Sequence, residues 1–338
     1  MTPQKTDITR PPKVARRKLA HQGVPARAVA GAANPLVDEL RPGQSIELLK
    51  ELHILTREGK LNQDSRRKLK QVYHLYQFIE KLLLELPDAA PEQPNDSPKT
   101  AVSPSDGARL DAMTLADHGA GKSYLGFILY DLFFKHRVRG HIYGIESRPE
   151  LVQKSQELAA RLGFERMSFL NLTVAQSASS ERLPRRMDMV TALHACDTAT
   201  DDAIAFGLQK RARVMVLVPC CQAEVARVLS QHKALSLSRT PLSELWRHPL
   251  HTREMGSQIT NVLRCLYLEA CGYQVTVTEL VGWEHSMKNE LIIARYSGHP
   301  KHASGQRLRA LLAEFGLLSL LHTRFTSLPD NDLAVREA

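Results

Sequence analysis

Short apolar segments alternate with helix-like segments along residues 110–300, and this order limits the possible folds more than any other feature of the sequence. The expected strands are almost continuously apolar, which is typical of parallel strands buried on both faces. Only seven residues, 283–289, separate the last two strands, and so short a connection requires an antiparallel pair. The order predicts an α/β protein with a Rossmann-like sheet, mostly parallel with an antiparallel last strand. The strands are expected at 112–117, 140–146, 167–173, 187–195, 212–221, 273–282 and 290–296, and helices at 122–135, 149–163 and 200–210.

Two helices are expected before the sheet, within residues 44–86. Ser45 is a candidate N-cap for the first, and Glu58-Gly59-Lys60 forms a turn before the second. One face of the second helix carries Leu69, Val72, Tyr73, Tyr76, Ile79 and Leu83, and the other carries Arg66, Arg67, Lys68 and Lys70. The sequence predicts a basic helical domain at 1–86, a Pro- and Ser-rich flexible linker at 87–109, the α/β domain at 110–300, and a C-terminal helix and tail at 301–338.

Positive charge is concentrated near the N-terminus of the 338-residue chain. Residues 1–70 hold fifteen Lys and Arg against seven Asp and Glu, which is +8 of the total net charge of +9. A basic region of this kind is typical of a surface that contacts a polyanion such as RNA. The charge alone is nearly as compatible with a solvated arm that has no specific partner.

The remaining composition is that of an ordinary globular protein, with 43% apolar and 24% charged residues. No apolar run is long enough to span a membrane, and the N-terminal segment lacks the apolar stretch of a secretory signal. The five cysteines are odd in number and include no zinc-binding CxxC pair. We expect reduced thiols, no metal site and a cytoplasmic protein, and we predict no oligomeric state.

The stretch LADHGAGKS, residues 115–123, has three possible interpretations. A triphosphate-binding loop needs a glycine where Ala116 stands, and a dinucleotide fingerprint needs one where Tyr124 stands. The third interpretation is an S-adenosylmethionine site, with Asp117, Gly119 and Gly121 at the first strand end. Glu146, at the second strand end, would then accept hydrogen bonds from the ribose hydroxyls. Lys122, Asn171 and Leu193 are further expected cofactor contacts.

Several segments, in this order, resemble a known family. They are ADHGAGKSYL, GIESRPELV, TALHACDTATDDAI, LVPCCQ and EHSMKNELIIAR. They are similar to the class I methyltransferase domain of the methyltransferase-like protein 25 family and its bacterial relatives, over about 110–297. A weaker similarity links them to a family of tRNA 2′-O-methyltransferases with a cysteine pair after the fifth strand. RKLKQVYHLYQFIEKLL resembles the segment that precedes the domain. The resemblance implies an S-adenosylmethionine-dependent methyltransferase and indicates the cofactor better than the target.

Candidate catalytic residues follow the fourth and fifth strands. His194 could take a proton from the methyl acceptor, or simply bind the backbone at the strand end. Asp197 could orient His194, or cap the helix that opens near Thr198, which we favour. Cys220 or Cys196 could attack a pyrimidine as a thiolate, although a cysteine at a strand end is more often a packing residue.

Candidate substrate-binding residues lie in two segments. His248, His251 and Arg253 cluster in the expected irregular start of segment 247–272, and either contact substrate or are simply exposed. His285, Lys288 and Asn289 lie between the last two strands, where Lys288 could meet a phosphate.

These features predict a methyltransferase whose basic N-terminal region binds RNA, with tRNA or rRNA as the preferred substrate. Two alternatives remain open. One is a methyltransferase for a protein or a small molecule. The other is a non-catalytic RNA-binding protein that retains the fold.

Overall fold

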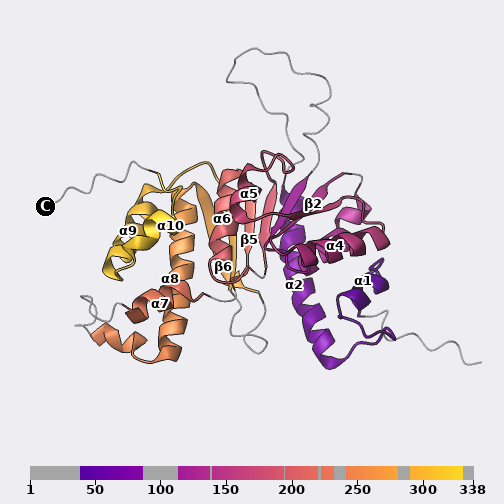
Figure 1. The fold of residues 1–338 in the computed structure, drawn as a ribbon, viewed down its shortest axis with the longest axis horizontal. Helices are drawn as coiled ribbons and strands as arrows, with labels where there is room; N and C mark the ends of the chain where they lie inside the picture. Colours follow the sequence, from indigo (N-terminus) through magenta and orange to yellow (C-terminus); the bar gives the residue numbers. More distant parts are fainter. Residues whose placement is uncertain are drawn as a thin grey trace, which may run out of the picture. The chain divides into compact units, whose positions relative to one another are not determined.

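Seven strands form one sheet in the order β3-β2-β1-β4-β5-β7-β6. Strands β1 to β5 run parallel, whereas β7 is antiparallel to both β5 and β6 (Figure 1). This confirms the predicted α/β class with a mostly parallel sheet and an antiparallel last strand. The strands are β1 (Thr114–His118), β2 (His141–Glu146), β3 (Met167–Asn171), β4 (Met189–Ala192), β5 (Val214–Leu217), β6 (Tyr273–Glu279) and β7 (Glu290–Tyr296).

The structure is a computed structural model that describes residues 39–86, 113–137, 139–193, 195–219, 222–231, 241–280 and 290–329. The helices and strands named below belong to one compact unit, Leu40–Ala338. Within the described ranges, no helix has the length and apolar character needed to cross a lipid bilayer.

Ten α-helices are defined within the described residues. Helices α3 and α6 cover opposite faces of the sheet, because Gly126 of α3 lies against Asp117 whereas Phe206 of α6 lies against the next residue, His118. The helices are α1 (Ile46–Glu51), α2 (Gln63–Glu85), α3 (Tyr124–Leu132), α4 (Pro149–Arg161), α5 (Val174–Ser179), α6 (Ala199–Gln209), α7 (Glu224–Gln231), α8 (Pro249–Ala270), α9 (His302–Glu314) and α10 (Leu321–Arg324).

Burial explains which strands form the centre of the sheet. Every residue of β4 and β5 is buried, as expected for central parallel strands covered by helices on both faces. Strand β6 is one of the two edge strands, with β3 at the other edge, and most residues of β6 are partly or fully exposed. The main core lies on the face covered by α6, α8 and α9, where Phe206, Tyr267 and Leu308 are buried.

The two helices expected before the sheet are present, and each has a side-chain cap. Ser45 Oγ accepts a hydrogen bond from the Leu48 amide at 3.1 Å, and Asn62 Oδ1 accepts one from the Ser65 amide at 2.8 Å. Helix α2 contacts α3, and Tyr76 of α2 donates to the Leu132 carbonyl at 3.3 Å. Both helices belong to the same compact unit as the sheet. The linker proposed at 87–109 lies outside the described residues.

The structure corrects the sequence interpretation of segment 247–272. We expected an irregular start around His248, His251 and Arg253, but helix α8 begins at Pro249 and continues to Ala270. Proline is well suited to the first helical position because its fixed φ is helical and its missing N–H has no intrahelical partner there.

Candidate active site

A tight glycine turn follows β1 and leads into α3. Gly119 and Gly121 have φ values of +68° and +57°, in the left-handed region that favours glycine. The Ala120 amide donates to the Ile145 carbonyl at 3.0 Å, which fastens the turn to the end of β2. Helix α3 comes close to the sheet at Gly126, where a Cβ would lie 3.5 Å from Asp117 Oδ2 of β1 and 3.6 Å from Ile142 Cγ2 of β2. The close approach that a third motif glycine would provide is therefore supplied two residues after Tyr124.

Asp117 lies beneath this turn, and its side chain is buried, with the residue only 2% exposed. Oδ1 accepts a hydrogen bond from Thr191 Oγ1 at 3.1 Å, and Oδ2 accepts one from Ser123 Oγ at 3.3 Å. Burial raises the pKa of Asp117 to about 6, although these hydrogen bonds act in the opposite direction. The carboxyl group links β1, β4 and the start of α3 beneath the turn. Direct contact between Asp117 and a cofactor stays a prediction.

Glu146 ends β2 and lies beside the glycine turn. Its Oε2 accepts a hydrogen bond from the Gly121 amide at 2.8 Å. Burial alone would raise the pKa of Glu146, but hydrogen bonds from Arg148 and the Gly121 amide lower it to about 2. The side chain is consequently ionised at neutral pH and faces the turn, as a carboxylate that accepts hydrogen bonds from a ribose diol must be.

Arg148 already occupies the open side of Glu146. Arg148 Nε lies 2.9 Å from Oε1, Nη2 lies 3.0 Å from Oε2, and the Arg148 amide donates to Oε1 at 3.0 Å. With the Gly121 amide, these contacts give each carboxylate oxygen at least two donors, about its capacity. The Arg148 side chain is 59% exposed and can move away, whereas the two amides are fixed. The site therefore fits a ribose diol once the Arg148 guanidinium has moved away from Glu146.

His118 is a buried residue at this edge that the sequence interpretation missed. It is 4% exposed, and neither ring nitrogen has a hydrogen-bond partner in the described part of the chain. Its ring lies 5.2 Å from that of Phe206, and burial lowers its pKa to about 4. Strand alternation could have revealed it: if Asp117 faces α3, the next side chain must face the core on the other side.

The other expected cofactor contacts lie around the same strand ends. Asn171, at the end of β3, donates its side-chain amide to the carbonyls of Glu146 and Ser147 at 3.1 and 2.9 Å. This contact shapes the backbone after β2. Lys122 is exposed on the turn, and Leu193 is half-buried directly after β4. A cofactor role for the three residues stays a prediction.

Asp197 caps a helix other than the expected one. Its Oδ1 accepts hydrogen bonds from the Ala223 and Glu224 amides at 2.9 and 3.1 Å, at the start of α7, and not at the start of α6. The residue has a left-handed φ of +53°, which turns its side chain toward the segment after β5. The loops after β4 and β5 are thereby tied together. A role in orienting His194 stays a prediction.

A buried ion pair from α8 fixes the loop after β4, and sequence reasoning did not find it. Arg264, 1% exposed, contacts Asp201 through Nη2 at 2.6 Å and Nε at 2.8 Å. Its Nη2 also donates to the Asp197 carbonyl at 2.8 Å, and its Nη1 to Asn261 Oδ1 at 3.2 Å. Asn261 continues the network to Gln222 at 3.1 Å, directly after the segment Pro219-Cys220-Cys221.

Several candidate residues lie outside the described residues, and their roles stay predictions. They are His194, Cys220, His285, Lys288 and Asn289. Cys196 is described and exposed.

The candidate substrate residues of α8 lie at its exposed N-terminal end. The rings of His248 and His251 are 5.4 Å apart, and Arg253 pairs with Glu254 at 3.3 Å. Over the described ranges, no three His, Cys, Asp or Glu side chains come together as a metal site requires.

Comparison with known proteins indicates the enzyme class. Residues 67–228 match a family model described as a methyltransferase domain, and this segment contains the glycine turn and Glu146. A comparison with curated proteins gave no match. The matched segment is a methyltransferase domain, as predicted, and the protein is an S-adenosylmethionine-dependent methyltransferase.

Solved structures of low sequence identity resemble the chain. Magnesium protoporphyrin IX methyltransferase from Synechocystis PCC 6803, with bound SAH, is 13% identical, with 74% of this chain and 93% of that chain covered and a TM-score of 0.39. A putative caffeoyl-CoA O-methyltransferase from Staphylococcus aureus is 11% identical, with coverages of 75% and 92% and a TM-score of 0.40. The Methanococcus jannaschii fibrillarin pre-rRNA processing protein is 12% identical, with coverages of 56% and 68% and a TM-score of 0.34. Likeness at this level assigns no substrate to the chain.

Proposed function

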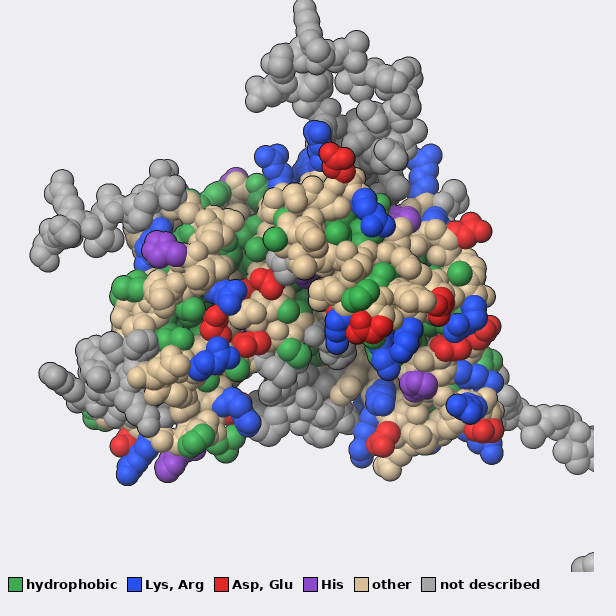
Figure 2. All heavy atoms as spheres, in the orientation of Figure 1, with side chains coloured by type: hydrophobic (Ala, Val, Ile, Leu, Met, Phe, Trp, Pro, Cys, Tyr) green, Lys and Arg blue, Asp and Glu red, His purple; other side chains and the backbone are tan. Residues whose placement is uncertain are grey.

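We propose that this methyltransferase modifies RNA. The observation that carries the proposal is the basic face of α2, where Arg66, Arg67, Lys68 and Lys70 are all exposed. In Figure 2, Lys and Arg side chains gather over α1 and α2, among several acidic ones. The family match begins at residue 67, so most of this helix, including Arg67, Lys68 and Lys70 but not Arg66, is part of the matched segment. Exposed cations bind phosphates regardless of base sequence, which suits a tRNA or rRNA substrate.

In this proposal the carboxyl edge of the sheet holds the cofactor. Glu146 would accept hydrogen bonds from the ribose diol, and the turn of Gly119 and Gly121 would lie against the amino-acid tail. S-adenosylmethionine supplies a methyl group on a sulfonium, and its transfer by in-line displacement depends mainly on how the reactants are positioned. His194 would accept a proton from the nucleophile if it carries one. Cys220 would serve only in a mechanism through a pyrimidine adduct.

The proposal includes membership in the methyltransferase-like protein 25 family, which is supported by the sequence motifs around the turn and after β4 and β5. It also includes action in the cytoplasm. A protein or small-molecule substrate is the main alternative, in which the basic face of α2 would bind another partner. The two alternatives differ in how binding responds to salt.

Binding of the full chain to bulk tRNA and rRNA at a series of salt concentrations tests the substrate class. We expect the logarithm of the association constant to fall linearly with the logarithm of salt concentration, because each phosphate contact releases counterions. Replacing Arg66, Arg67, Lys68 and Lys70 together with Gln is expected to weaken binding and reduce the slope. Binding that ignores both salt and these substitutions would contradict an RNA substrate.

Methyl transfer itself is measured with methyl-labelled cofactor and total RNA. We expect label to enter RNA from a strain that lacks this gene, but not RNA from the parent strain, whose sites are already methylated. The label should resist protease and be released by ribonuclease. Label in protein, or in neither fraction, would contradict the proposal.

The cofactor site has its own test, calorimetry with S-adenosylhomocysteine. Glu146→Gln keeps the side-chain volume but removes the charge, and we expect at least a tenfold loss of affinity because a charged acceptor for the diol is lost. A purine triphosphate is the control ligand and should not bind the wild-type protein. If it binds and S-adenosylhomocysteine does not, the turn binds phosphates.

A further inference from the structure

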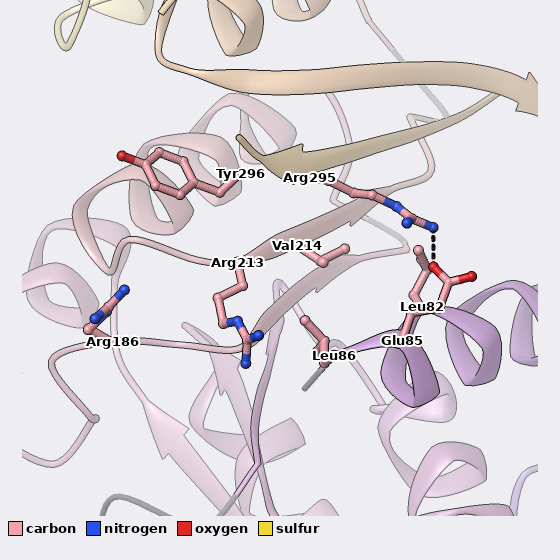
Figure 3. Close-up of a pocket in the computed structure, with 8 residues that line it drawn as sticks. All are labelled: Leu82, Glu85, Leu86, Arg186, Arg213, Val214, Arg295 and Tyr296. Carbon is pink, nitrogen blue, oxygen red and sulfur yellow. Dashed lines mark ion pairs between the residues drawn. The ribbon is translucent and has the colours of Figure 1, made fainter. Parts of the chain in front are cut away.

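A pocket of about 290 Å³ lies at the amino-terminal edge of the sheet, away from the candidate active site (Figure 3). Three arginines line it. Arg186 precedes β4, Arg213 directly precedes β5, and Arg295 lies near the end of β7. The C-terminal end of α2 contributes Glu85. We call this site the arginine pocket.

Strand register brings the three arginines to one place. Strand β7 is antiparallel to β5, and Arg295 lies opposite Val214, the neighbour of Arg213. The Tyr296 amide donates to the Arg213 carbonyl at 2.8 Å, and the Arg213 amide donates to the carbonyl of Met187, beside Arg186, at 3.2 Å. Because the backbone of the sheet makes these contacts, the three residues line one pocket without any ligand, with the Arg186 and Arg295 side chains at opposite sides of it (Figure 3).

Three of the described residues that line the pocket are arginines, and one, Glu85, carries a carboxylate. Arg295 pairs with Glu85 at 2.7 Å, and Arg213 pairs with Asp188 at 3.2 Å. Asp188 is fixed to β1, because its Oδ2 accepts from the Thr114 amide at 2.8 Å. Among the described lining residues, guanidinium groups therefore outnumber carboxylates, in a concave site that focuses their field.

Glu85 is the acid that an anionic ligand could replace. Its side chain is 39% exposed, and that of Arg295 is 47% exposed, so their ion pair contributes little to stability. Glu85 is also the last residue of α2, at the negative end of the helix dipole, where a carboxylate is disfavoured.

The pocket also has an aromatic wall. Tyr296 is 55% exposed and its ring lies edge-on to Tyr273, with centroids 5.2 Å apart. In Figure 3, Tyr296 and Glu85 lie at opposite sides of the site, with Arg213 between them. An exposed aromatic ring beside guanidinium groups is the combination with which proteins hold a base and its phosphate in single-stranded RNA.

We propose that the arginine pocket binds a phosphate of the RNA substrate, at the sheet edge opposite the methyl-transfer site. The proposal rests on the proposed function. The four residues of β4 separate the two edges by about 13 Å, from a rise of about 3.3 Å per residue. A substrate that contacts both edges must extend well beyond one nucleotide, so short fragments should be poor substrates.

The test is fluorescence anisotropy of the full chain with a labelled single-stranded RNA, together with calorimetry for S-adenosylhomocysteine. The double variant Arg186→Gln/Arg295→Gln is expected to bind RNA about tenfold more weakly. Its salt slope should fall in magnitude by about 0.7, the value for one lost phosphate contact on a single strand. Glu85→Gln should bind RNA more tightly, because it removes the competing carboxylate. Arg161→Gln, an exposed paired arginine at the end of α4, is the matched control and should bind like wild type.

The outcomes separate this proposal from the proposed function. If wild-type protein binds RNA and the double variant binds equally well, the pocket proposal is wrong while an RNA substrate stands. If wild-type protein binds the cofactor product but no RNA, both proposals are wrong. A final experiment adds inorganic phosphate at constant ionic strength and measures the melting temperature of wild type and of the double variant. Should it raise the melting temperature of wild type but not of the double variant, while RNA affinity is equal in both, the pocket binds free phosphate and the RNA assignment is overturned.

Discussion

The two edges of the sheet hold their charged groups in opposite settings. At the carboxyl edge, Asp117 and Glu146 are 2% and 6% exposed, and each is held by hydrogen bonds from neighbouring segments. At the amino edge, the arginines and Glu85 are in contact with solvent. Charged side chains are therefore expected to have different roles at the two edges.

The difference indicates that the two edges of the sheet have different functions. Buried hydrogen-bonded groups fix the loops after β1, β2 and β4 before a ligand arrives, which favours precise positioning for methyl transfer. Exposed guanidinium groups remain mobile and act at longer range, which favours the capture of a polyanion. On this view, substitutions at the carboxyl edge should change stability most, and those at the amino edge should change binding.

The largest expected effect comes from the buried ion pair of the carboxyl edge. Arg264→Ala is expected to lower the free energy of unfolding by about 3–5 kcal/mol, because Asp201 would remain buried without its partner. Arg295→Ala, which breaks the exposed pair with Glu85, should cost at most about 1 kcal/mol. Urea unfolding at neutral pH measures both.

A second variant distinguishes loss of charge pairing from loss of packing. Arg264→Met/Asp201→Leu replaces both partners with apolar side chains and should recover much of the stability lost in Arg264→Ala. If Arg264→Ala and Arg295→Ala lowered the free energy of unfolding equally, the proposed contrast between the two edges would be wrong.

The next largest effect is a pH dependence of stability. In the wild type, the contributions of the adjacent residues Asp117 and His118 largely cancel. The folded-state pKa of His118 is lowered to about 4 from 6.5, so its stability contribution is present above pH 6.5 and lost as pH falls toward 4. The folded-state pKa of Asp117 is raised to about 6 from 3.8, so its contribution is present below pH 3.8 and lost as pH rises through 6. Each amounts to about 3 kcal/mol, and between pH 4 and 6 they oppose each other.

Single variants should separate the two contributions. With Asp117→Asn, the free energy of unfolding should fall by about 3 kcal/mol more than in the wild type between pH 6.5 and 4, because only His118 then titrates there. With His118→Leu, it should rise over the same interval relative to wild type. Glu146, with a pKa of about 2, titrates mainly below this window. Parallel pH profiles for the three proteins would show that these side chains are not buried as described.

The fold was predictable because its strongest signals are local. Buried parallel strands appear as apolar runs, and the short connection at 283–289 requires an antiparallel pair. The expected strand ends were too long: the strand expected at 187–195 pairs only over Met189–Ala192. Apolar character continues into the loop, at Leu193 and Ala195, after the ladder has ended. Hydropathy cannot distinguish a buried loop residue from a strand residue.

The candidate site was predictable only in part, because its contacts depend on tertiary structure. Asp117 and Glu146 could be placed at one edge because each ends a strand. The partner of Arg264, however, is 63 residues away in the sequence, and a single arginine in a mixed helix usually indicates an exposed side chain. Asp197 was expected to cap the helix that follows it, but the loop after β5 lies closer to its carboxylate.

The smallest expected effect tests whether Arg148 competes with the cofactor. Arg148→Ala frees one position on each oxygen of Glu146, whereas the Gly121 and Arg148 amides still donate. The affinity for S-adenosylhomocysteine should rise by up to about fivefold, since a partly exposed ion pair of up to about 1 kcal/mol no longer has to break before the diol binds. Calorimetry measures the change, with Arg161→Ala at the other end of α4 as the control that leaves affinity unaltered. A lower affinity in Arg148→Ala would mean that the guanidinium itself contacts the cofactor. The carboxyl edge would then share the exposed, ligand-binding character that we assign to the amino edge.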